Sequence, residues 1–397
     1  MNKASTKLLE NRRQLSRNQA VGFVATMSIV GIVVVWSIFA SGTPIAFEAE
    51  SGTFYYQEDL ANQTGRIYIG TDPAMQTIEL AKRPVALVLG NHQVYNLKGI
   101  GFRRYASNEQ ANLTVGAVYD SGNGGLIENV SMIQNAGQAL AVAPAGMTVH
   151  RSVLAFNGFN GMGSNGHSQG TGTYTLDNLT MDSIIVNNNN LKHFGLHCTL
   201  SCATSGVKIA HMNGYSVKNS LFENTQSTGD GFWCDEACQN GVMVNNVIRG
   251  NGGSGISYQV STTGIVASNL IYNNGTGISF GSGNSSIVNN TLIDLWLYDD
   301  ARNAEDLRGS NIGPDTRDMV VENNIFSSGA SGPITIFKVN RSSEAQASDP
   351  NNDNTGPNTP GFFTNLDYNT YYRINGGGGT LVNWVDNTTG TDAGVTT

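Results

Sequence analysis

The stretch GVMVNNVIRGN, residues 241–251, alternates apolar and polar side chains around a pair of asparagines. Its pattern, Gly-x-x-Val-x-Asn-x-(Ile/Leu), recurs in GYSVKNSLFEN (214–224), GIVASNLIYNN (264–274), NSSIVNNTLID (284–294) and DMVVENNIFSS (318–328). Weaker copies lie upstream in GLIENVSMIQN (125–135), GMTVHRSVLAFN (146–157) and LTMDSIIVNNN (179–189). A period of about 20–27 residues with alternating apolar positions is typical of one coil of a parallel β-helix.

The repeat therefore predicts an all-β fold, a right-handed parallel β-helix (solenoid). An N-terminal transmembrane helix, argued below from residues 1–40, is expected to precede it. Each coil is expected to bury its Val, Ile and Leu side chains and to stack on the next at about 4.8 Å. The handedness follows the usual rule for parallel crossovers. Asparagines at equivalent corners can form hydrogen-bonded ladders. We assign four of them to one corner: Asn219, Asn246, Asn269 and Asn289.

The N-terminus carries a basic segment followed by an uncharged apolar stretch at residues 20–40. The basic residues are Lys3, Lys7, Arg12, Arg13 and Arg17. The stretch is about long enough to cross a bilayer, and basic residues before it predict an inside N-terminus and an outside body. We expect a cytoplasmic tail over residues 1–19 and a single-pass signal anchor over 20–40. The alternative is a signal peptide cleaved after Ala40.

The exported body is expected to begin with strands and a cap over residues 41–84. The β-helix follows over 85–340, and a loop-rich segment over 341–397. The whole chain has a net charge of −8, and without residues 1–40 it has 17 basic and 29 acidic residues, a net charge near −12. A nucleic-acid-binding protein would show the opposite balance, so that class of partner is excluded.

The stretch from Gly206 to Asp294 resembles the right-handed parallel β-helix proteins of the pectate-lyase-like superfamily. It is most similar to exported bacterial members with a GGVKI … GLWxD pair of coils. The segments that carry the resemblance are SGVKI (205–209), GFWCDE (231–236), GISYQVS (255–261), DYNTYY (367–372), RIYIGTDP (66–73) and GIGFRRYAS (99–107). The resemblance implies the fold, which hosts lyases, hydrolases, epimerases, adhesins and phage spikes alike.

The chain departs from the pectinolytic members in its motifs. It lacks Asn-Thr-Asp, Gly-His-Gly, Arg-Ile-Lys and Trp-x-Asp-His, and Gln259 stands where related sequences tend to have an acid. A carboxylate-pair mechanism is therefore not carried over from the family.

Aligning successive coils on their glycines predicts which side chains share the outer face. The alignment uses Gly206, Gly231, Gly255 and Gly277. Because side chains alternate along a strand, Lys208 should lie beside Trp233 on that face. Ala210 should lie beside Asp235, which makes Lys208 and Asp235 diagonal neighbours, roughly 7 Å apart at Cβ.

This outer face is the candidate site. We predict Lys208 and Asp235 as catalytic acid–base groups, with His197 overhanging them, since such groups can move protons on a saccharide. The predicted sugar-binding residues are Trp233, Glu236 and Gln259, with the indole of Trp233 stacked on a sugar ring. The alternative is a Lys208–Asp235 salt bridge of little energetic weight in solvent, with Trp233 covered by the loop 186–204.

Three other histidines lie near this face or border it in sequence, namely His167, His193 and His211. Each can act as an acid or base near neutral pH, and each alone is more often a structural hydrogen-bond donor.

The four cysteines form two C-x3-C pairs around the candidate site, Cys198, Cys202, Cys234 and Cys238. In an exported protein they are expected to form two disulfides, and all three pairings remain open. A four-thiolate zinc site is the alternative. We expect no metal or cofactor; the carboxylate-rich insertion 294–318 is read as a solvated loop, with a Ca²⁺ site as its alternative.

Two classes of function fit these observations. The first is a membrane-anchored extracytoplasmic enzyme, a lyase or hydrolase that acts on polysaccharide along the outer coil face. The second is a non-catalytic glycan-binding or adhesive surface protein. The expected partners are a polysaccharide and, through residues 20–40, the membrane.

Overall fold

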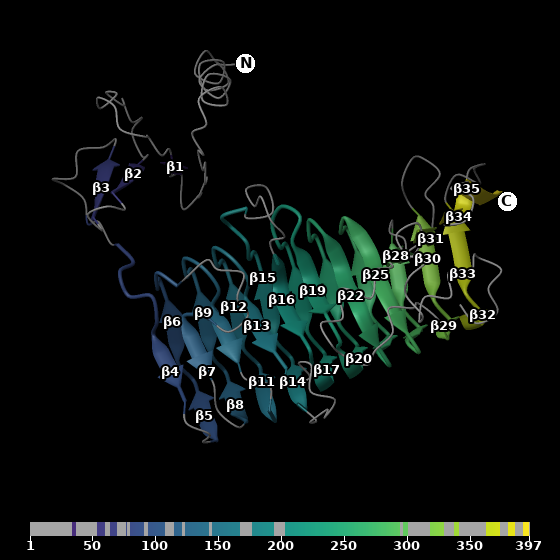
Figure 1. The fold of residues 1–397 in the computed structure, drawn as a ribbon, viewed down its shortest axis with the longest axis horizontal. Coiled ribbons are helices and arrows are strands. Elements are labelled where there is room, and N and C mark those ends of the chain that lie inside the picture. Colours follow the sequence, from purple (N-terminus) through teal and green to yellow (C-terminus); the bar gives the residue numbers. More distant parts are fainter. Residues whose placement is uncertain are drawn as a thin grey trace, which may run out of the picture. The chain divides into compact units, whose positions relative to one another are not determined.

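The chain folds into β-strands throughout the part that the computed structural model describes (Figure 1). The described residues are 34–36, 54–59, 64–69, 77, 80–90, 94–107, 115–120, 124–142, 145–166, 177–193, 203–293, 297–300, 318–328, 337–340, 363–373, 380–385 and 392–396. None of these residues is helical. The chain divides into two units, Met1–Leu80 and Ala81–Thr397.

The first unit contains a three-stranded sheet of β1 (Val34–Trp36), β2 (Phe54–Asp59) and β3 (Thr64–Ile69). Strand β2 pairs with β1 in parallel and with β3 in antiparallel orientation. Of the predicted span 20–40, only β1 lies within the described residues. Among the described residues there is no helix long and apolar enough to cross a membrane.

The second unit is a parallel β-helix of three sheets. Apart from the first three and the last, each strand pairs with the strand three positions earlier in the chain, so that three consecutive strands make one coil. Sheet 1 consists of β4 (Leu87–Leu89), β7 (Val118–Asp120), β10 (Leu140–Val142), β13 (Met162–Asn165), β16 (Ser205–Ala210), β19 (Asp230–Asp235), β22 (Ser254–Thr262), β25 (Thr276–Gly283), β28 (Leu297–Asp300), β31 (Phe337–Asn340), β34 (Thr380–Val385) and β35 (Asp392–Thr396). Strands β34 and β35 are antiparallel, and the other pairs of this sheet are parallel.

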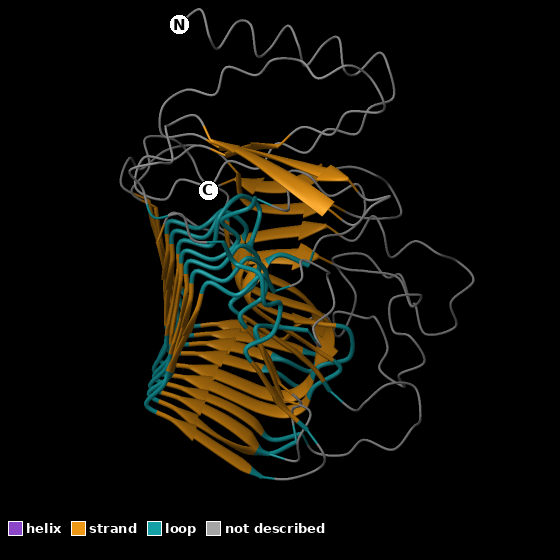
Figure 2. Cartoon of the chain, turned by 90° about the vertical axis from the view of Figure 1, so that its left-hand side faces the viewer, coloured by secondary structure: helices purple, strands orange, loops and turns teal. Residues whose placement is uncertain are grey.

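Sheets 2 and 3 each contain ten described strands. Sheet 2 consists of β5 (Tyr95–Lys98), β8 (Gly125–Glu128), β11 (Met147–His150), β14 (Leu179–Asp182), β17 (Asn213–Lys218), β20 (Gln239–Val244), β23 (Ile265–Ala267), β26 (Ser286–Val288), β29 (Met319–Glu322) and β32 (Phe363–Asp367). Sheet 3 consists of β6 (Gly101–Arg103), β9 (Ser131–Ile133), β12 (Val153–Ala155), β15 (Ile185–Asn187), β18 (Leu221–Glu223), β21 (Val247–Arg249), β24 (Leu270–Tyr272), β27 (Thr291–Ile293), β30 (Ile325–Ser328) and β33 (Thr370–Arg373). Figure 2 shows the strands of this unit stacked in layers, with loops at the corners.

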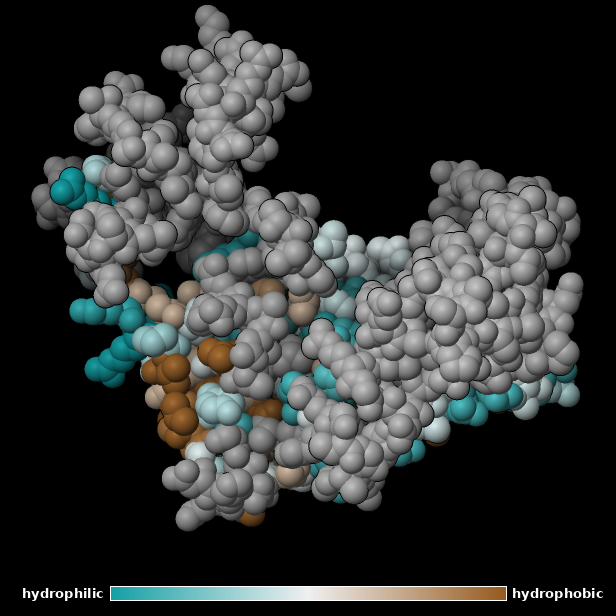
Figure 3. All heavy atoms as spheres, in the orientation of Figure 1, coloured by the Kyte–Doolittle hydropathy of each residue, from teal (hydrophilic) through white to brown (hydrophobic). Residues whose placement is uncertain are grey.

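The parallel ladders continue past residue 340, the predicted end of the β-helix. Strand β32 pairs with β29, β33 with β30, and β34 with β31. At the other end, in Figure 3, apolar side chains gather near β4 and β7, where Val88 is 61% exposed.

The core is formed by the inward positions of each strand, as the alternation predicts. In sheet 1, Val207, Phe232, Ile256 and Ile278 form one buried row in register. The rings of Tyr215 and Phe222 lie 6.2 and 5.9 Å from that of Phe232. These ring contacts of Phe232 anchor in the core the strand that carries Trp233 on its outer side.

An asparagine ladder occupies the corner after sheet 2, but not with the predicted members. Its rungs are Asn246, Asn269, Asn290, Asn324 and Asn369, where the Oδ1 of each accepts from the backbone N–H and Nδ2 of the one before. The assignment of Asn219 and Asn289 to this ladder was wrong. Each lies one residue before the ladder position of its coil and has a left-handed backbone conformation, with φ of 53° and 57°. Asparagine tolerates this conformation better than most residues.

A second ladder, which the sequence analysis missed, lies at the corner after sheet 3. Its members are Asn135, Asn157, Asn189, Thr225, Asn251 and Asn274. Five of the six positions hold asparagine. The sixth is Thr225, whose backbone N–H donates to Asn251 Oδ1 at 3.0 Å.

The glycines that set the register of sheet 1 pack against this second ladder. A Cβ on Gly231 would lie 2.8 Å from Asn251 Nδ2 and 2.6 Å from the Gly255 carbonyl oxygen. Gly206 and Gly255 meet the same obstacles from the next coil. The repeat therefore needs glycine at the second residue of each of these strands, because the corner leaves no space there for a side chain.

Candidate functional site

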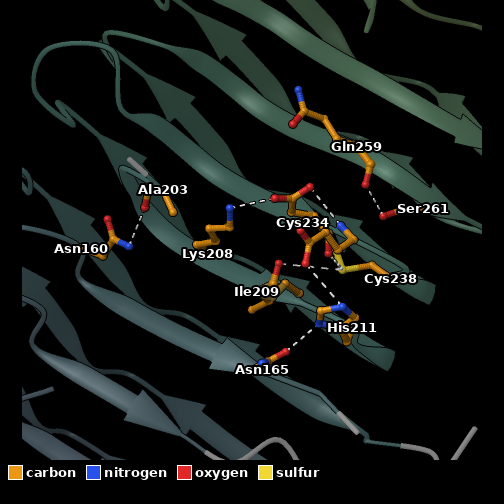
Figure 4. A network of polar contacts seen from close by, with 12 residues as sticks. Asn160, Asn165, Ala203, Lys208, Ile209, His211, Cys234, Cys238, Gln259 and Ser261 are labelled. Atoms are coloured by element: carbon orange, nitrogen blue, oxygen red, sulfur yellow. Dashed lines mark hydrogen bonds and ion pairs between the residues drawn. A yellow bond between two sulfur atoms is a disulfide. The ribbon is translucent and has the colours of Figure 1, made fainter. Parts of the chain in front are cut away.

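The candidate site lies on the outer side of β16 and β19, where the predicted register is confirmed. Lys208 pairs with Trp233, and Ala210 pairs with Asp235. Lys208 Nζ lies diagonally opposite Asp235, 2.8 Å from its Oδ2. Figure 4 shows Lys208 and His211 on the same side of the strands as this network of polar contacts. Val207 and Ile209 on either side of Lys208 point into the core, so strand alternation holds the amine on the outer face.

The ion pair is buried, which differs from the solvent-exposed pair that the sequence analysis weighed. Lys208 and Asp235 are each 7% exposed. Solvent does not screen such a pair, and removing one partner leaves an uncompensated buried charge, which typically costs about 3–5 kcal/mol. Removing either partner alone is therefore expected to destabilise the fold more than breaking a surface salt bridge.

Trp233 faces the amine directly and is the partly exposed member of the group. Lys208 Nζ lies 3.3 Å from the centroid of the indole ring, which is a cation–π contact. Within the described part of the chain, the buried indole Nε1–H has no hydrogen-bond partner. Buried donors are usually paired, so this N–H is an exception among the described residues.

Burial lowers the pKa of the Lys208 amine below the usual value for lysine. Attraction by the carboxylates of Asp235, Glu236 and Asp230 opposes this effect without cancelling it. A buried amine with a lowered pKa beside a carboxylate is a feature of functional sites.

A second pair adjoins the first at the corner after these strands. His211 Nε2 lies 3.4 Å from Glu236 Oε2, and His211 Nδ1 lies 2.8 Å from Asn165 Oδ1. The sequence analysis named His211 only as a nearby histidine. Because His211 follows Ala210 directly and Glu236 follows Asp235, extending the register by one residue past the strand ends would have predicted this pair.

The remaining predicted residues are not all brought to this group. Gln259 is on β22 and is 6% exposed; because Trp233 pairs with Ser257 and Cys234 with Tyr258, it occupies the next register position, beside Asp235, as predicted. His193 Nδ1 lies 2.6 Å from Ser227 Oγ, at another corner. His197 and His167 lie outside the described residues.

One of the expected disulfides is present, between Cys234 and Cys238. Both cysteines are fully buried, and the bridge is local to the corner between β19 and β20. Cys198 and Cys202 lie outside the described residues.

No group of three or more His, Cys, Asp and Glu that could hold a metal ion occurs among the described residues. Most of the insertion 294–318, to which Ca²⁺ was the alternative, falls outside them.

Residues 114–292 match the family model described as the right-handed β-helix region. The match spans the coils that carry Lys208, Trp233 and Asp235, and it agrees with the parallel three-sheet architecture. No curated protein and no solved structure matches the chain. A β-helix hosts many chemistries, so any function has to be argued from the site itself.

The site combines four chemical capabilities in a small space. The Lys208 amine can accept or donate a proton, and the Asp235 carboxylate orients it. The ring of Trp233 offers an apolar face. His211 with Glu236 adds a second proton-carrying group at the neighbouring corner.

Proposed function

We propose that this protein acts on polysaccharide at the outer face of sheet 1, as a lyase- or hydrolase-like enzyme. The observation that carries the proposal is the Lys208 amine, whose pKa burial lowers, held 2.8 Å from Asp235 Oδ2 and 3.3 Å from the centre of the Trp233 ring. A lysine with a lowered pKa is a better general base near neutral pH than an exposed lysine.

The contacts of Asp235 assign it a positioning role. Its Oδ2 faces Lys208 Nζ, and its Oδ1 accepts the backbone N–H of Glu236 at 3.0 Å. Since both oxygens are engaged by the protein, Asp235 is suited to orient the amine, and Lys208 is the group that would exchange a proton with a substrate.

Trp233 supports a carbohydrate ligand. An indole face fits the C–H face of a sugar ring, and tryptophan combines that apolar surface with one polar donor. The resemblance of segments 205–209 and 231–236 to pectate-lyase-like proteins points to the same class of ligand.

A non-catalytic glycan-binding protein is the second candidate. The burial of the Lys208–Asp235 pair favours a binding protein, because both residues are 7% exposed and the amine and the carboxylate already bind each other. In that case Trp233, the more exposed residue, would be the main contact with the glycan.

We further propose that the body works outside the cytoplasm, tethered by residues 20–40. The supporting observations are the five basic residues before this uncharged stretch and its length, which match the rules for a signal anchor.

The two functions are separated by a panel of neutral, cationic and uronate polysaccharides. Unsaturated products are measured by ultraviolet absorbance, new reducing ends by a colour reaction, and binding by calorimetry. If the protein is an enzyme, K208A should lower turnover by about 10²–10⁴-fold. The control for loss of a lysine is K218A, which breaks a more exposed coil-to-coil ion pair, with Asp182, and thermal unfolding of K208A shows that loss of turnover is not loss of the fold. Binding without turnover by the wild type supports the binding protein, and the absence of both contradicts the proposal.

A further inference from the structure

The corner between β19 and β20 differs from its neighbours in the same column of corners. Three residues, Glu236, Ala237 and Cys238, separate these strands, whereas two separate β16 from β17, β22 from β23, and β25 from β26. The neighbouring corners each contain one left-handed residue: His211 (φ 50°), Thr263 (φ 52°) and Asn284 (φ 50°).

This longer corner places two consecutive residues in the left-handed region. Glu236 has φ of 47° and Ala237 has φ of 62°. Neither is a glycine or an asparagine, so each is held in a conformation that L-residues with a side chain seldom adopt. Such residues persist only where the surrounding structure fixes them.

The disulfide between Cys234 and Cys238 encloses this corner. Cys234 is an inward residue of β19, Cys238 directly precedes β20, and both are fully buried. The cross-link therefore fixes the two ends of a segment that contains only Asp235, Glu236 and Ala237.

That enclosed segment supplies both carboxylates of the site. Asp235 Oδ2 lies 2.8 Å from Lys208 Nζ, and Glu236 Oε2 lies 3.4 Å from His211 Nε2. The backbone is engaged as well, since the Glu236 carbonyl accepts the N–H of His211 at 2.7 Å. Each of the two ion pairs of the site thus has one partner inside the cross-linked segment and one on the preceding coil.

We propose that the Cys234–Cys238 disulfide is a positioning element of the site, which holds Asp235 against Lys208 and Glu236 against His211. Without the cross-link, the two left-handed residues relax and the carboxylates leave their partners. The proposal rests on the proposed function only in so far as Lys208 is the group that acts on the substrate.

The test follows the ionisation of Lys208 in the full-length protein without any glycan. Acylation of Lys208 by a small amine-reactive reagent is measured by peptide mass spectrometry as a function of pH. The midpoint reports ionisation, while the plateau reports access of the reagent. The proteins compared are the wild type, D235N, C234A/C238A and the control I278V, a core truncation two coils away in the row of Phe232.

Because Asp235 raises the pKa of Lys208 against the effect of burial, its loss should move the midpoint to lower pH. We expect C234A/C238A to reproduce the shift of D235N, and I278V to retain the wild-type midpoint. A wild-type midpoint in C234A/C238A, beside a shifted one in D235N, overturns the proposal. An unshifted D235N overturns it too, since Asp235 would then not be held against the amine.

If C234A/C238A does not fold, C234V/C238V replaces it. Valine keeps apolar volume at both buried positions without restoring the cross-link, so the same two outcomes are read from this variant. The experiment uses no glycan. An unshifted midpoint in the variant without the disulfide therefore counts against the positioning role of the disulfide and leaves the proposed function untouched.

Discussion

Trp233 is the residue through which a ligand would meet the site, because it is the only partly exposed one of the three central residues. One face of its indole is taken by Lys208 Nζ at 3.3 Å. Any sugar ring must therefore use another part of the indole than the Nε1–H, because that N–H is buried.

Substituting Trp233 by alanine should weaken glycan binding by about 1–3 kcal/mol, by analogy with the stacking of bases on aromatic side chains. Calorimetry with the best ligand of the panel measures the change. W233F keeps an aromatic face, so it should retain most of the affinity. Unchanged affinity in W233A would exclude Trp233 from the ligand site.

At the scale of the elements, the corners determine how the coils stack. Six ladder asparagines donate through Nδ2 both to the next rung and to a carbonyl of the preceding coil, as Asn251 does to Asn274 Oδ1 and Phe222 O; the others are Asn157, Asn246, Asn269, Asn290 and Asn324. Thr225 interrupts this series after Asn189, and its buried Oγ1 has no partner among the described residues. The ladder after sheet 3 is therefore broken at the coil just before the one that carries Trp233.

Substituting Thr225 by asparagine should join the two halves of this ladder. The new Oδ1 would accept from Asn189, and the new Nδ2 would donate to the preceding coil. The space at the corner suits this side chain because Gly206 faces Thr225 as Gly231 faces Asn251. Each net hydrogen bond contributes about 0.5–1.5 kcal/mol, so the free energy of unfolding should rise by about that amount or more. Urea titration measures it, with T225V as control, which removes the unpartnered hydroxyl without adding a rung. Equal stability of both variants would contradict the joined ladder.

The misplaced asparagines show where spacing alone fails. In an Asn-Asn pair such as Asn289–Asn290, the first residue turns the chain with positive φ and the second forms the ladder. Both roles suit asparagine, so the repeat cannot say which is which. The register of sheet 1, by contrast, was predicted correctly, because glycine at the start of these strands is required by the corner and marks one position only.

At the scale of the whole molecule, the repeat predicted the parallel coils, the core and the juxtaposition of Lys208 with Trp233. It did not predict that Lys208 and Asp235 are 7% exposed, because an alternating pattern distinguishes inside from outside and says nothing of what covers the outside. Nor did it choose the local pairing of Cys234, which depends on the one-residue extension of a single corner. Both properties arise from departures from the repeat, and the candidate site lies where those departures concentrate.

The charge distribution along the chain leads to the last prediction. The five basic residues before the apolar stretch 20–40 and the body of net charge near −12 place opposite charges on its two sides. If residues 20–40 span the bilayer, high salt should leave the full-length protein in the membrane fraction, because salt screens charges but does not weaken burial of an apolar segment in lipid. Detergent should release it, and externally added protease should digest the body in intact cells. Deleting residues 1–40 is the control and should abolish membrane association. Salt-released protein whose N-terminus is Ser41 would show instead that the segment is a cleaved signal peptide.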